Sequence, residues 1–203
     1  MAWRPGPGLA ELLTARLTKA QIQPRDLLTE VRPDLWLLRG GRELANAERM
    51  MSQSMEPMQE MTRALRVFEN AFTYAIVDTS PGWGTMLINV LMFAHEVVSP
   101  VSLESLSLDG LVDFTERLED VREVNTRVSL RFVVPTFYDR RTAQSDLFIT
   151  QVRNAYPDEV CDAVRVSVKL SEAPAFGKTI YEYAPRSTGA EDYGRLVARV
   201  ANG

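Results

Sequence analysis

The chain has 203 residues, of which 45% are apolar and 25% are charged, and its net charge at pH 7 is −4. This balance is typical of a globular protein, so we expect residues 1–203 to form a single domain, with residues 1–8 flexible because they are rich in Pro and Gly. No run approaches the roughly 20 apolar residues that cross a membrane. The single cysteine favours a reducing cytoplasm, and the negative charge excludes DNA binding through bulk charge alone.

Helices are predicted where apolar residues recur at helical spacing. The stretches are residues 9–20, 57–70, 85–94, 107–125, 141–156 and 190–201, with a short helical turn at 24–26. Methionines cluster between positions 50 and 61. At this spacing they favour core packing and a linker over metal or haem chemistry, because thioether side chains fill irregular gaps.

Short apolar runs between the helices predict strands. They cover residues 34–38, 74–78, 96–101, 129–136 and 161–166, and a further run at 179–183 looks extended. Strands that alternate with helices predict an α/β fold with a mostly parallel sheet and helices on both faces. Because ligands bind at the carboxyl ends of such strands, Asp78, Ser99 and Thr136 lie where function is expected.

Five segments occur in an order that is specific to one family. In chain order they are Tyr74–Gly82 (YAIVDTSPG), Glu96–Val101 (EVVSPV), Pro135–Thr142 (PTFYDRRT), Leu170–Ile180 (LSEAPAFGKTI) and Tyr183–Tyr193 (YAPRSTGAEDY). The first resembles the Walker B strand of the ParA/Soj and MinD partition ATPases, and the last two resemble the C-terminal signature of chromosomal ParA/Soj proteins. With weaker matches at 33–38 and 42–48, the resemblance covers nearly the whole chain. It implies a truncated, ParA-like P-loop NTPase fold.

The front end of that fold is missing from the pattern. Family members begin with a strand and a Walker A loop, K-G-G-x-G-K-T, whose backbone N–H groups, lysine and threonine hold phosphates and Mg²⁺. Here the residues before Leu9 contain no lysine, Lys19 lies in a helical pattern, and Lys169 lies between two apolar residues. Only Gly177–Thr179 imitates the end of the loop, and the run after it looks extended instead of helical. The acidic second strand is absent as well. We therefore expect neither ATP nor Mg²⁺ as a cofactor and no ATP hydrolysis.

Asp78 corresponds, by this resemblance, to the Walker B acid that is associated with Mg²⁺. One carboxylate without phosphates to share the ion makes a poor Mg²⁺ site. We interpret Asp78 as a vestige that ends a strand and caps the next turn. His95 is the only histidine, and no nucleophile motif lies near it, so we predict no catalytic residue.

Basic residues in the C-terminal half of complete family members bind DNA without sequence preference. The resemblance places Arg141 and Lys169 at two of these positions, and Arg140 and Arg165 lie beside them in sequence. Phosphate contacts of this kind give an affinity that does not depend on sequence and falls with salt. Because the ATP switch is expected to be missing, the resemblance implies a constitutive homodimer that binds duplex DNA without nucleotide and associates with the nucleoid.

Three functions stay open at this point. The first is a DNA-partition protein that modulates a full-length ParA or meets a ParB-type partner. The second is an active partition ATPase whose Walker A segment lies upstream of Met1. The third is a module that pairs with other ParA subunits and does not bind DNA. A missing central strand also leaves sheet edges to be covered, either by a remodelled sheet or by a second subunit.

Overall fold

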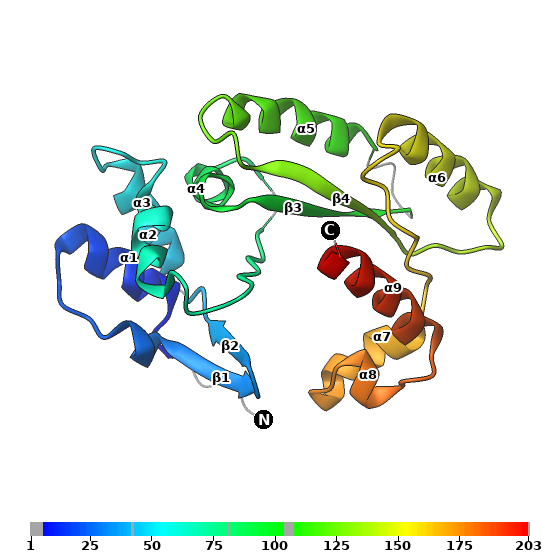
Figure 1. Ribbon diagram of the computed structural model, residues 1–203, viewed down its shortest axis with the longest axis horizontal. Coiled ribbons are helices and arrows are strands. Elements are labelled where there is room, and N and C mark those ends of the chain that lie inside the picture. The colour runs from blue at the N-terminus through cyan, green and yellow to red at the C-terminus, as the bar shows by residue number, and fades with distance from the viewer. Residues whose placement is uncertain (1–5, 42, 81, 104–107, 203) are drawn as a thin grey trace. The chain divides into compact units, whose positions relative to one another are not determined.

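The computed structural model describes residues 6–41, 43–80, 82–103 and 108–202 (Figure 1). The chain divides into two compact units, and the boundary lies between His95 and Glu96. Residues 1–5 of the segment predicted to be flexible, and Ser107 at the predicted start of a helix, lie outside the described part. Every helix among the described residues is too short or too polar to cross a membrane.

The first unit is mainly helical. Its helices are α1 (Leu9–Thr18), α2 (Leu44–Ser52), α3 (Glu60–Leu65) and α4 (Thr85–Phe93), with the 3₁₀ turns η1 (Pro24–Leu27) and η2 (Arg66–Phe68). Its core consists of Leu12, Leu13, Leu27, Ala47, Met51 and Ala64. Met51 and Met61 are buried whereas Met55 is exposed, so the methionine-rich stretch supplies core packing and linker, as predicted.

The helix predicted from residue 57 begins three residues later. The amide of Asn89, a buried side chain on α4, donates to the carbonyl of Pro57 (2.6 Å) and accepts from the backbone N–H of Met61 (3.1 Å). Asn89 thereby satisfies an N–H in the first turn of α3, which has no partner inside its own helix. A cap that comes from another element leaves no signal in the local sequence.

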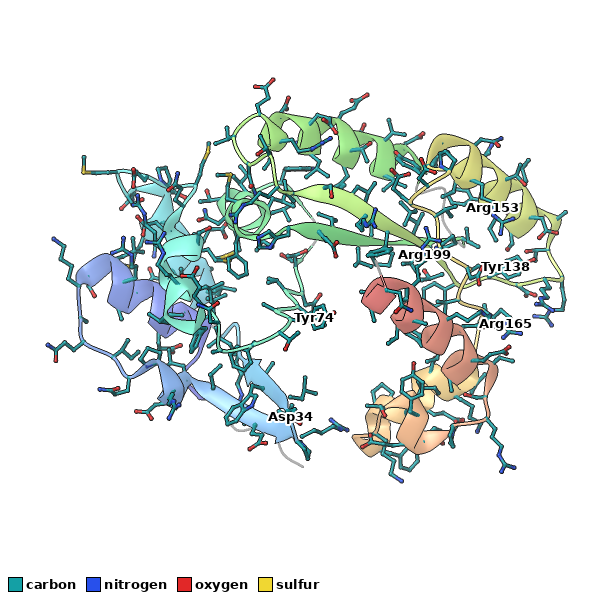
Figure 2. The ribbon with its side chains drawn as sticks, in the orientation of Figure 1. Asp34, Tyr74, Tyr138, Arg153, Arg165 and Arg199 are labelled. Carbon is teal, nitrogen blue, oxygen red and sulfur yellow. The ribbon has the colours of Figure 1, made fainter. Side chains whose placement is uncertain are left out.

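A hairpin of two antiparallel strands, β1 (Leu28–Arg32) and β2 (Leu35–Leu38), follows η1. The predicted strand at 34–38 is thus confirmed from Leu35, whereas β1 was not predicted because its polar residues hide the alternation. Asp34 lies at the tip of the hairpin (Figure 2) with a φ of 60°. Aspartate tolerates this left-handed conformation better than most residues because its short side chain bonds locally.

The strand predicted at residues 74–78 does not form. Among the described residues no strand pairs with this segment, which includes Tyr74 (Figure 2), and Ile76 is 95% exposed. An apolar run indicates that a segment is suited to a sheet, but a strand exists only where a neighbour accepts its backbone hydrogen bonds. The prediction of a strand at residues 74–78 was therefore wrong, although the residue pattern is typical of a strand.

The second unit is built on two parallel strands, β3 (Glu96–Ser102) and β4 (Ser129–Thr136). Residues 159–166 run alongside β4 as a third, irregular segment. The backbone N–H of Cys161 donates to the carbonyl of Val133 (2.8 Å), and that of Val164 donates to the carbonyl of Pro135 (2.8 Å). Only isolated parallel bridges form there, so the strand predicted at 161–166 is in place but is not a regular strand.

Helices cover both faces of this small sheet, as predicted. They are α5 (Leu108–Arg122), α6 (Ala143–Ala155), α7 (Val168–Glu172) and α9 (Thr188–Asn202). Val133 packs in a core with α5 and α6, whereas its neighbours Phe132 and Val134 pack in a second core with α7 and α9. This follows from the alternation of side chains along a strand, and it explains why β4 is apolar on both faces.

The segment after α7 is helical, which corrects the extended run predicted at 179–183. It comprises η3 (Ala173–Phe176) and α8 (Ile180–Tyr183). The backbone N–H of Glu182 donates to Thr179 Oγ1 (3.2 Å), and that of Thr179 donates to Glu182 Oε2 (2.7 Å). This reciprocal capping box starts a helix in a stretch whose Thr, Ile and Tyr residues favour a strand.

Candidate nucleic-acid interface

The segments that carry Arg141 and Lys169 leave the small sheet at its carboxyl edge. The ladder between β4 and its irregular neighbour continues to Tyr138, whose N–H donates to the carbonyl of Val164 (3.0 Å). The N–H of Val166 in turn donates to the carbonyl of Tyr138 (3.1 Å). Since the two segments are parallel, the residues that follow them emerge at the same edge. Arg141 follows the first segment and Lys169 follows the second.

Arg141 projects into solvent with its side chain 88% exposed. Its Nη2 lies 2.7 Å from Asp139 Oδ2 and its Nε lies 3.0 Å from Asp139 Oδ1, which also accepts from the backbone N–H of Arg141 at 3.0 Å. These hydrogen bonds, first from the side chain and then from the backbone, lower the pKa of Asp139 to about 2. The guanidinium is anchored along one edge, and its Nη1 has no partner among the described residues.

Arg140 is exposed and has no hydrogen bond or ion pair within the described part of the chain. The neighbouring Tyr138 donates its hydroxyl proton to Asp146 Oδ1 (2.7 Å), and this bond raises the pKa of the tyrosine. The charges of Arg140 and of Arg153 on α6 act on that pKa in the opposite direction. Arg153 is thus a further cation whose charge acts on the Tyr138 side chain, which the family resemblance did not indicate.

Lys169 is about half exposed and sits in a cluster of three side chains. Its Nζ lies 2.8 Å from Glu172 Oε2, which also accepts the hydroxyl of Tyr183 at 2.9 Å. The ammonium also lies 5.7 Å from the centre of the Tyr183 ring, and Phe176 stacks on that ring. The hydrogen bond to Glu172 raises the pKa of Lys169, so the ammonium carries its charge throughout the neutral range.

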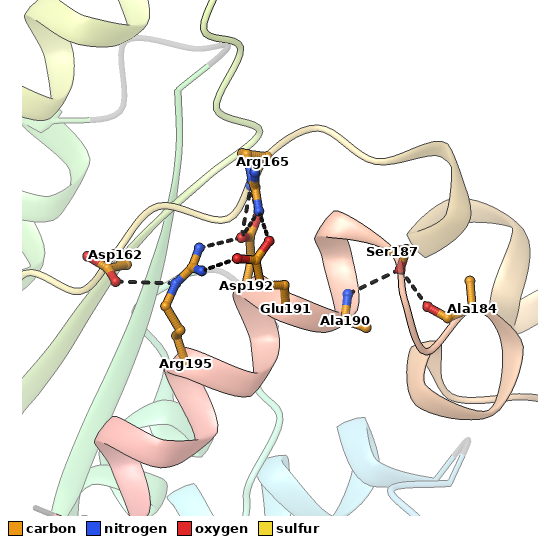
Figure 3. Close-up of polar contacts among 8 residues, drawn as sticks. All are labelled: Asp162, Arg165, Ala184, Ser187, Ala190, Glu191, Asp192 and Arg195. Carbon is orange, nitrogen blue, oxygen red and sulfur yellow. Dashed lines mark hydrogen bonds and ion pairs between the residues drawn. The ribbon is translucent and has the colours of Figure 1, made fainter.

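Arg165 differs from the other predicted cations because its Nε, Nη2 and backbone N–H are bound within the fold and its side chain is mostly buried (Figure 3). Its Nη2 lies 2.6 Å from Asp192 Oδ1 and 2.7 Å from Glu191 Oε2, while its backbone N–H donates to Asp192 Oδ2 at 2.9 Å. Arg195 Nη2 also binds Asp192 Oδ1, at 2.6 Å, and Arg195 Nε lies 3.4 Å from Asp162 Oδ2. The bonds to Asp192 and then Glu191 raise the pKa of Arg165.

Asp192 itself is almost completely buried, with its side chain 1% exposed. Burial by itself raises the pKa of this carboxyl, but the hydrogen bonds and charges of Arg165 and Arg195 outweigh that effect and hold the pKa below its usual range. Arg165 thus joins the irregular third segment to α9. The structure therefore presents Arg140, Arg141 and Lys169 to solvent, and it uses Arg165 internally.

Asp78 is exposed and belongs to the irregular segment of the first unit. The described residues contain no group of three or more His, Cys, Asp or Glu side chains that is arranged to hold a metal ion. Asp78 is therefore not part of a metal-ligating cluster in the described part of the chain.

The residues that surround the three lysines do not fit an ATP phosphate site. Lys19 is the C-terminal cap of α1, and the carbonyl end of a helix repels phosphate. Lys178 precedes the four-residue helix α8, at whose start the N–H groups of Thr179 and Glu182 are satisfied by the side chains of Glu182 and Thr179. Lys169 is bound to Glu172. None of the three follows a strand and a glycine-rich loop, which is the arrangement that holds phosphates.

Comparison with known proteins defines the class of this fold. Residues 9–131 match the family model described as an AAA domain. The nucleotide-free structure of McdA from Cyanothece matches this chain with a TM-score of 0.79 and 17% identity. The match covers 94% of this chain and 78% of McdA. The complex of a single-substitution variant of McdA with ATP gives a TM-score of 0.78. The fold is therefore the α/β fold of ParA-like P-loop NTPases, as predicted.

Two curated relatives narrow the class further. The chromosome partitioning protein ParA of Caulobacter vibrioides is 30% identical over 172 residues, which is 83% of this chain and 64% of the relative. The sporulation initiation inhibitor protein Soj of Bacillus subtilis is 35% identical over 161 residues, which is 78% of this chain and 64% of the relative. The chain belongs to the ParA/MinD-type family of partition ATPases. It spans less than two thirds of the length of these relatives.

The two carboxylates that hold the exposed cations were not predicted. Asp139 and Glu172 lie inside the motifs PTFYDRRT and LSEAPAFGKTI, in which the family resemblance indicates only the basic positions. Their spacing from Arg141 and Lys169, two and three residues, is short enough for a local ion pair. That spacing was the available signal.

Proposed function

We propose that this chain is a DNA-partition protein that binds duplex DNA without sequence preference and without ATP, through Arg141 and Lys169. The observation that carries the proposal is the parallel ladder at Tyr138, which sends both basic segments out at one edge of the sheet. Both side chains are exposed, and Arg140 adds a third cation there. Membership of a family that includes chromosome partitioning proteins supports the same function.

Each of these cations can bind a backbone phosphate but cannot identify a base by charge alone. Arg141 has one edge of its guanidinium anchored, so its Nη1 is oriented at little entropic cost before DNA arrives. Each neutralised phosphate adds about −0.9 to the slope of log affinity against log salt. Contacts from Arg140, Arg141 and Lys169 therefore correspond to a slope of about −3 per chain.

Independence from ATP is supported by the positions of the three lysines. Among the described residues, each lysine either ends a helix, is bound to a carboxylate or precedes a capped four-residue helix. We therefore propose that neither ATP nor Mg²⁺ is a cofactor of this chain and that it does not hydrolyse ATP. Asp78 is then a remnant of the Walker B position.

We further propose that the chain acts as a constitutive homodimer, associated with the nucleoid, that modulates a full-length ParA or meets a ParB-type partner. Two copies of a weak phosphate-binding edge raise the overall affinity through effective concentration, without any new contact. This arrangement suits a protein whose single edge offers only a few cations.

Fluorescence anisotropy of labelled duplexes of two unrelated sequences tests the proposal. The titrations are run at low and moderate salt, with and without Mg²⁺-ATP. We expect saturable binding to both duplexes that weakens with salt and is unaffected by ATP. Arg141→Ala and Lys169→Ala each weaken it. Arg122→Ala is the matched control and leaves binding unchanged, because this exposed arginine is paired with Glu119 on α5, away from the residues that follow the two parallel segments.

The other outcomes separate the alternatives. Binding that occurs only with Mg²⁺-ATP contradicts nucleotide independence and supports an active partition ATPase. An absence of binding under all conditions contradicts DNA binding and supports a module that pairs with other ParA subunits.

A further inference from the structure

Arg141 and Lys169, the two cations proposed to contact DNA, are each paired with a carboxylate. Each is held by a carboxylate close to it in the chain: Asp139 binds Arg141 at 2.7 Å in the turn after β4, and Glu172 binds Lys169 at 2.8 Å within α7. We name Asp139 and Glu172 the holding carboxylates. In both pairs the cation is the more exposed partner, so the carboxylate lies nearer the fold and the cation faces the solvent.

We propose that the holding carboxylates attenuate DNA binding, because an incoming phosphate must share Arg141 and Lys169 with them. This inference rests on the proposed function. It assigns to Asp139 and Glu172 a role that the basic residues alone do not reveal: they set how weak and how reversible the DNA contact is.

The geometry at Arg141 shows how the sharing operates. Asp139 occupies the edge formed by Nε and Nη2, which leaves the Nη1 side for a phosphate. A carboxylate and a phosphate on two sides of one guanidinium lie on the order of 6 Å apart, where repulsion between two unit charges in water lowers affinity roughly threefold. The anchoring of the side chain offsets only part of this, because a guanidinium is already planar and preorganised.

At Lys169 the competition is more direct. An ammonium is a compact charge with three donors, and one of them points at Glu172 Oε2. Glu172 is kept in place by the hydroxyl of Tyr183, which donates to the same oxygen at 2.9 Å. A phosphate that binds Lys169 therefore meets a carboxylate that is fixed within hydrogen-bond distance of the ammonium.

This attenuation is constant across the physiological range and is not a pH switch. The hydrogen bonds from Arg141 keep the pKa of Asp139 at about 2, and those from Lys169 and Tyr183 lower the pKa of Glu172. Both holding carboxylates are thus ionised wherever DNA binding is measured.

The test compares Asp139→Asn and Glu172→Gln with the wild-type chain in the same anisotropy titration. Both substitutions remove a charge and keep an acceptor oxygen for Arg141 and for Tyr183. We expect each to tighten DNA binding about threefold, and the double variant about tenfold, when all are compared at one salt concentration. Unchanged thermal unfolding shows that the fold is kept.

Glu119→Gln is the matched control. Glu119 binds Arg122 at 2.8 Å with the same spacing of three residues as the Lys169–Glu172 pair, but on α5. Glu119→Gln changes the net charge by the same amount as the two test variants, but it frees neither Arg141 nor Lys169. Because salt screens distant exposed charges, we expect it to leave affinity within about twofold of the wild type. A gain equal to that of Glu172→Gln would mean that bulk charge alone acts, and it would overturn the inference.

A double-mutant cycle with Arg141→Ala separates this inference from the proposed function. If the attenuation acts through Arg141, Asp139→Asn gives no gain in an Arg141→Ala background. If the wild type binds DNA through Arg141 and Lys169 but the two carboxylate variants bind equally or more weakly, the attenuation is wrong and the proposed function stands. If Arg141→Ala and Lys169→Ala leave binding unchanged, the proposed function fails and the inference fails with it.

Discussion

Two ion pairs of the second unit involve arginines for which the sequence predicts the same role. Arg165 and Arg141 are both predicted to bind DNA, and each is bound to an aspartate at 2.6 to 2.7 Å. Their surroundings differ. The side chain of Arg165 is 20% exposed and meets Asp192, which is buried, whereas Arg141 is almost fully exposed and meets a partly exposed Asp139.

This difference separates a structural arginine from one that is available to a ligand. Leaving a buried carboxylate without its cation is costly, so Asp192 retains Arg165. An exposed pair is worth little because water and salt screen it, so Asp139 does not prevent a phosphate from reaching Arg141. The distance between the two charged groups is nearly the same in both pairs, so burial is what distinguishes their roles.

The largest effect that would test this contrast is expected from Asp192→Ala. The substitution removes the carboxylate shared by Arg165 and Arg195 and leaves the backbone N–H of Arg165 without its acceptor. We expect the free energy of unfolding to fall by about 3 kcal/mol, measured by urea denaturation. A loss as small as that of Asp139→Ala, an exposed pair, would contradict the distinction between the two.

A second prediction concerns the packing that brings Asp192 to Arg165. A Cβ atom at Gly189, in the first turn of α9, would lie 2.8 Å from Leu170 Cγ. We expect Gly189→Ala to destabilise the protein by about 2 kcal/mol through overpacking, measured by urea denaturation.

Gly194 in the same helix provides the control. A Cβ atom there meets no atom within 4 Å, so Gly194→Ala is expected to stabilise the protein by up to about 1 kcal/mol through helix propensity. Equal effects at Gly189 and Gly194 would show that α9 is not closely packed on Leu170.

A third, smaller effect is expected from pH. The pKa of Asp192 is lower in the folded chain than its usual value, so its contribution is complete above the unfolded pKa of about 3.9 and is lost as the pH falls through the folded pKa. The difference in unfolding free energy between the wild type and Asp192→Asn should stay constant from neutral pH to about pH 5 and should narrow below about pH 4. A constant difference down to about pH 2.5 would contradict the prediction.

The smallest effect on stability is expected from Arg141→Ala. Because the Arg141–Asp139 pair is exposed, we expect the Tm in differential scanning calorimetry to change by no more than about 2 °C. The same variant is expected to weaken DNA binding, which Arg122→Ala does not. A large fall in Tm would place Arg141 among the structural arginines, with Arg165.

Local patterns were sufficient for most of the helices and for β3 and β4. Apolar spacing placed α4, α5, α6 and α9 to within a few residues, because one face of each helix is buried in its unit. The same kind of pattern failed at 74–78 and 179–183. The first segment has no neighbouring strand in the described part of the chain, and the second is converted to a helix by the capping box of Thr179 and Glu182.

For the candidate site, the motif order identified the family and the basic positions, but it could not rank them. Arg165 looks as suitable for DNA as Arg141 when only sequence neighbours are considered. Asp192 lies 27 residues further along the chain and Glu191 lies 26, so no local spacing could pair them with Arg165. The opposite holds for Asp139 and Glu172, whose partners are two and three residues away and were open to prediction.

The sequence by itself determined the family and the alternation of helices and strands, because these depend on residue types and short spacings. Only the tertiary structure decided that residues 74–78 form no strand, that Arg165 is bound inside the fold, and that Arg141 and Lys169 leave the sheet at one edge. Those outcomes depend on which distant segments supply backbone acceptors and carboxylates, and on how far each ion pair is removed from water.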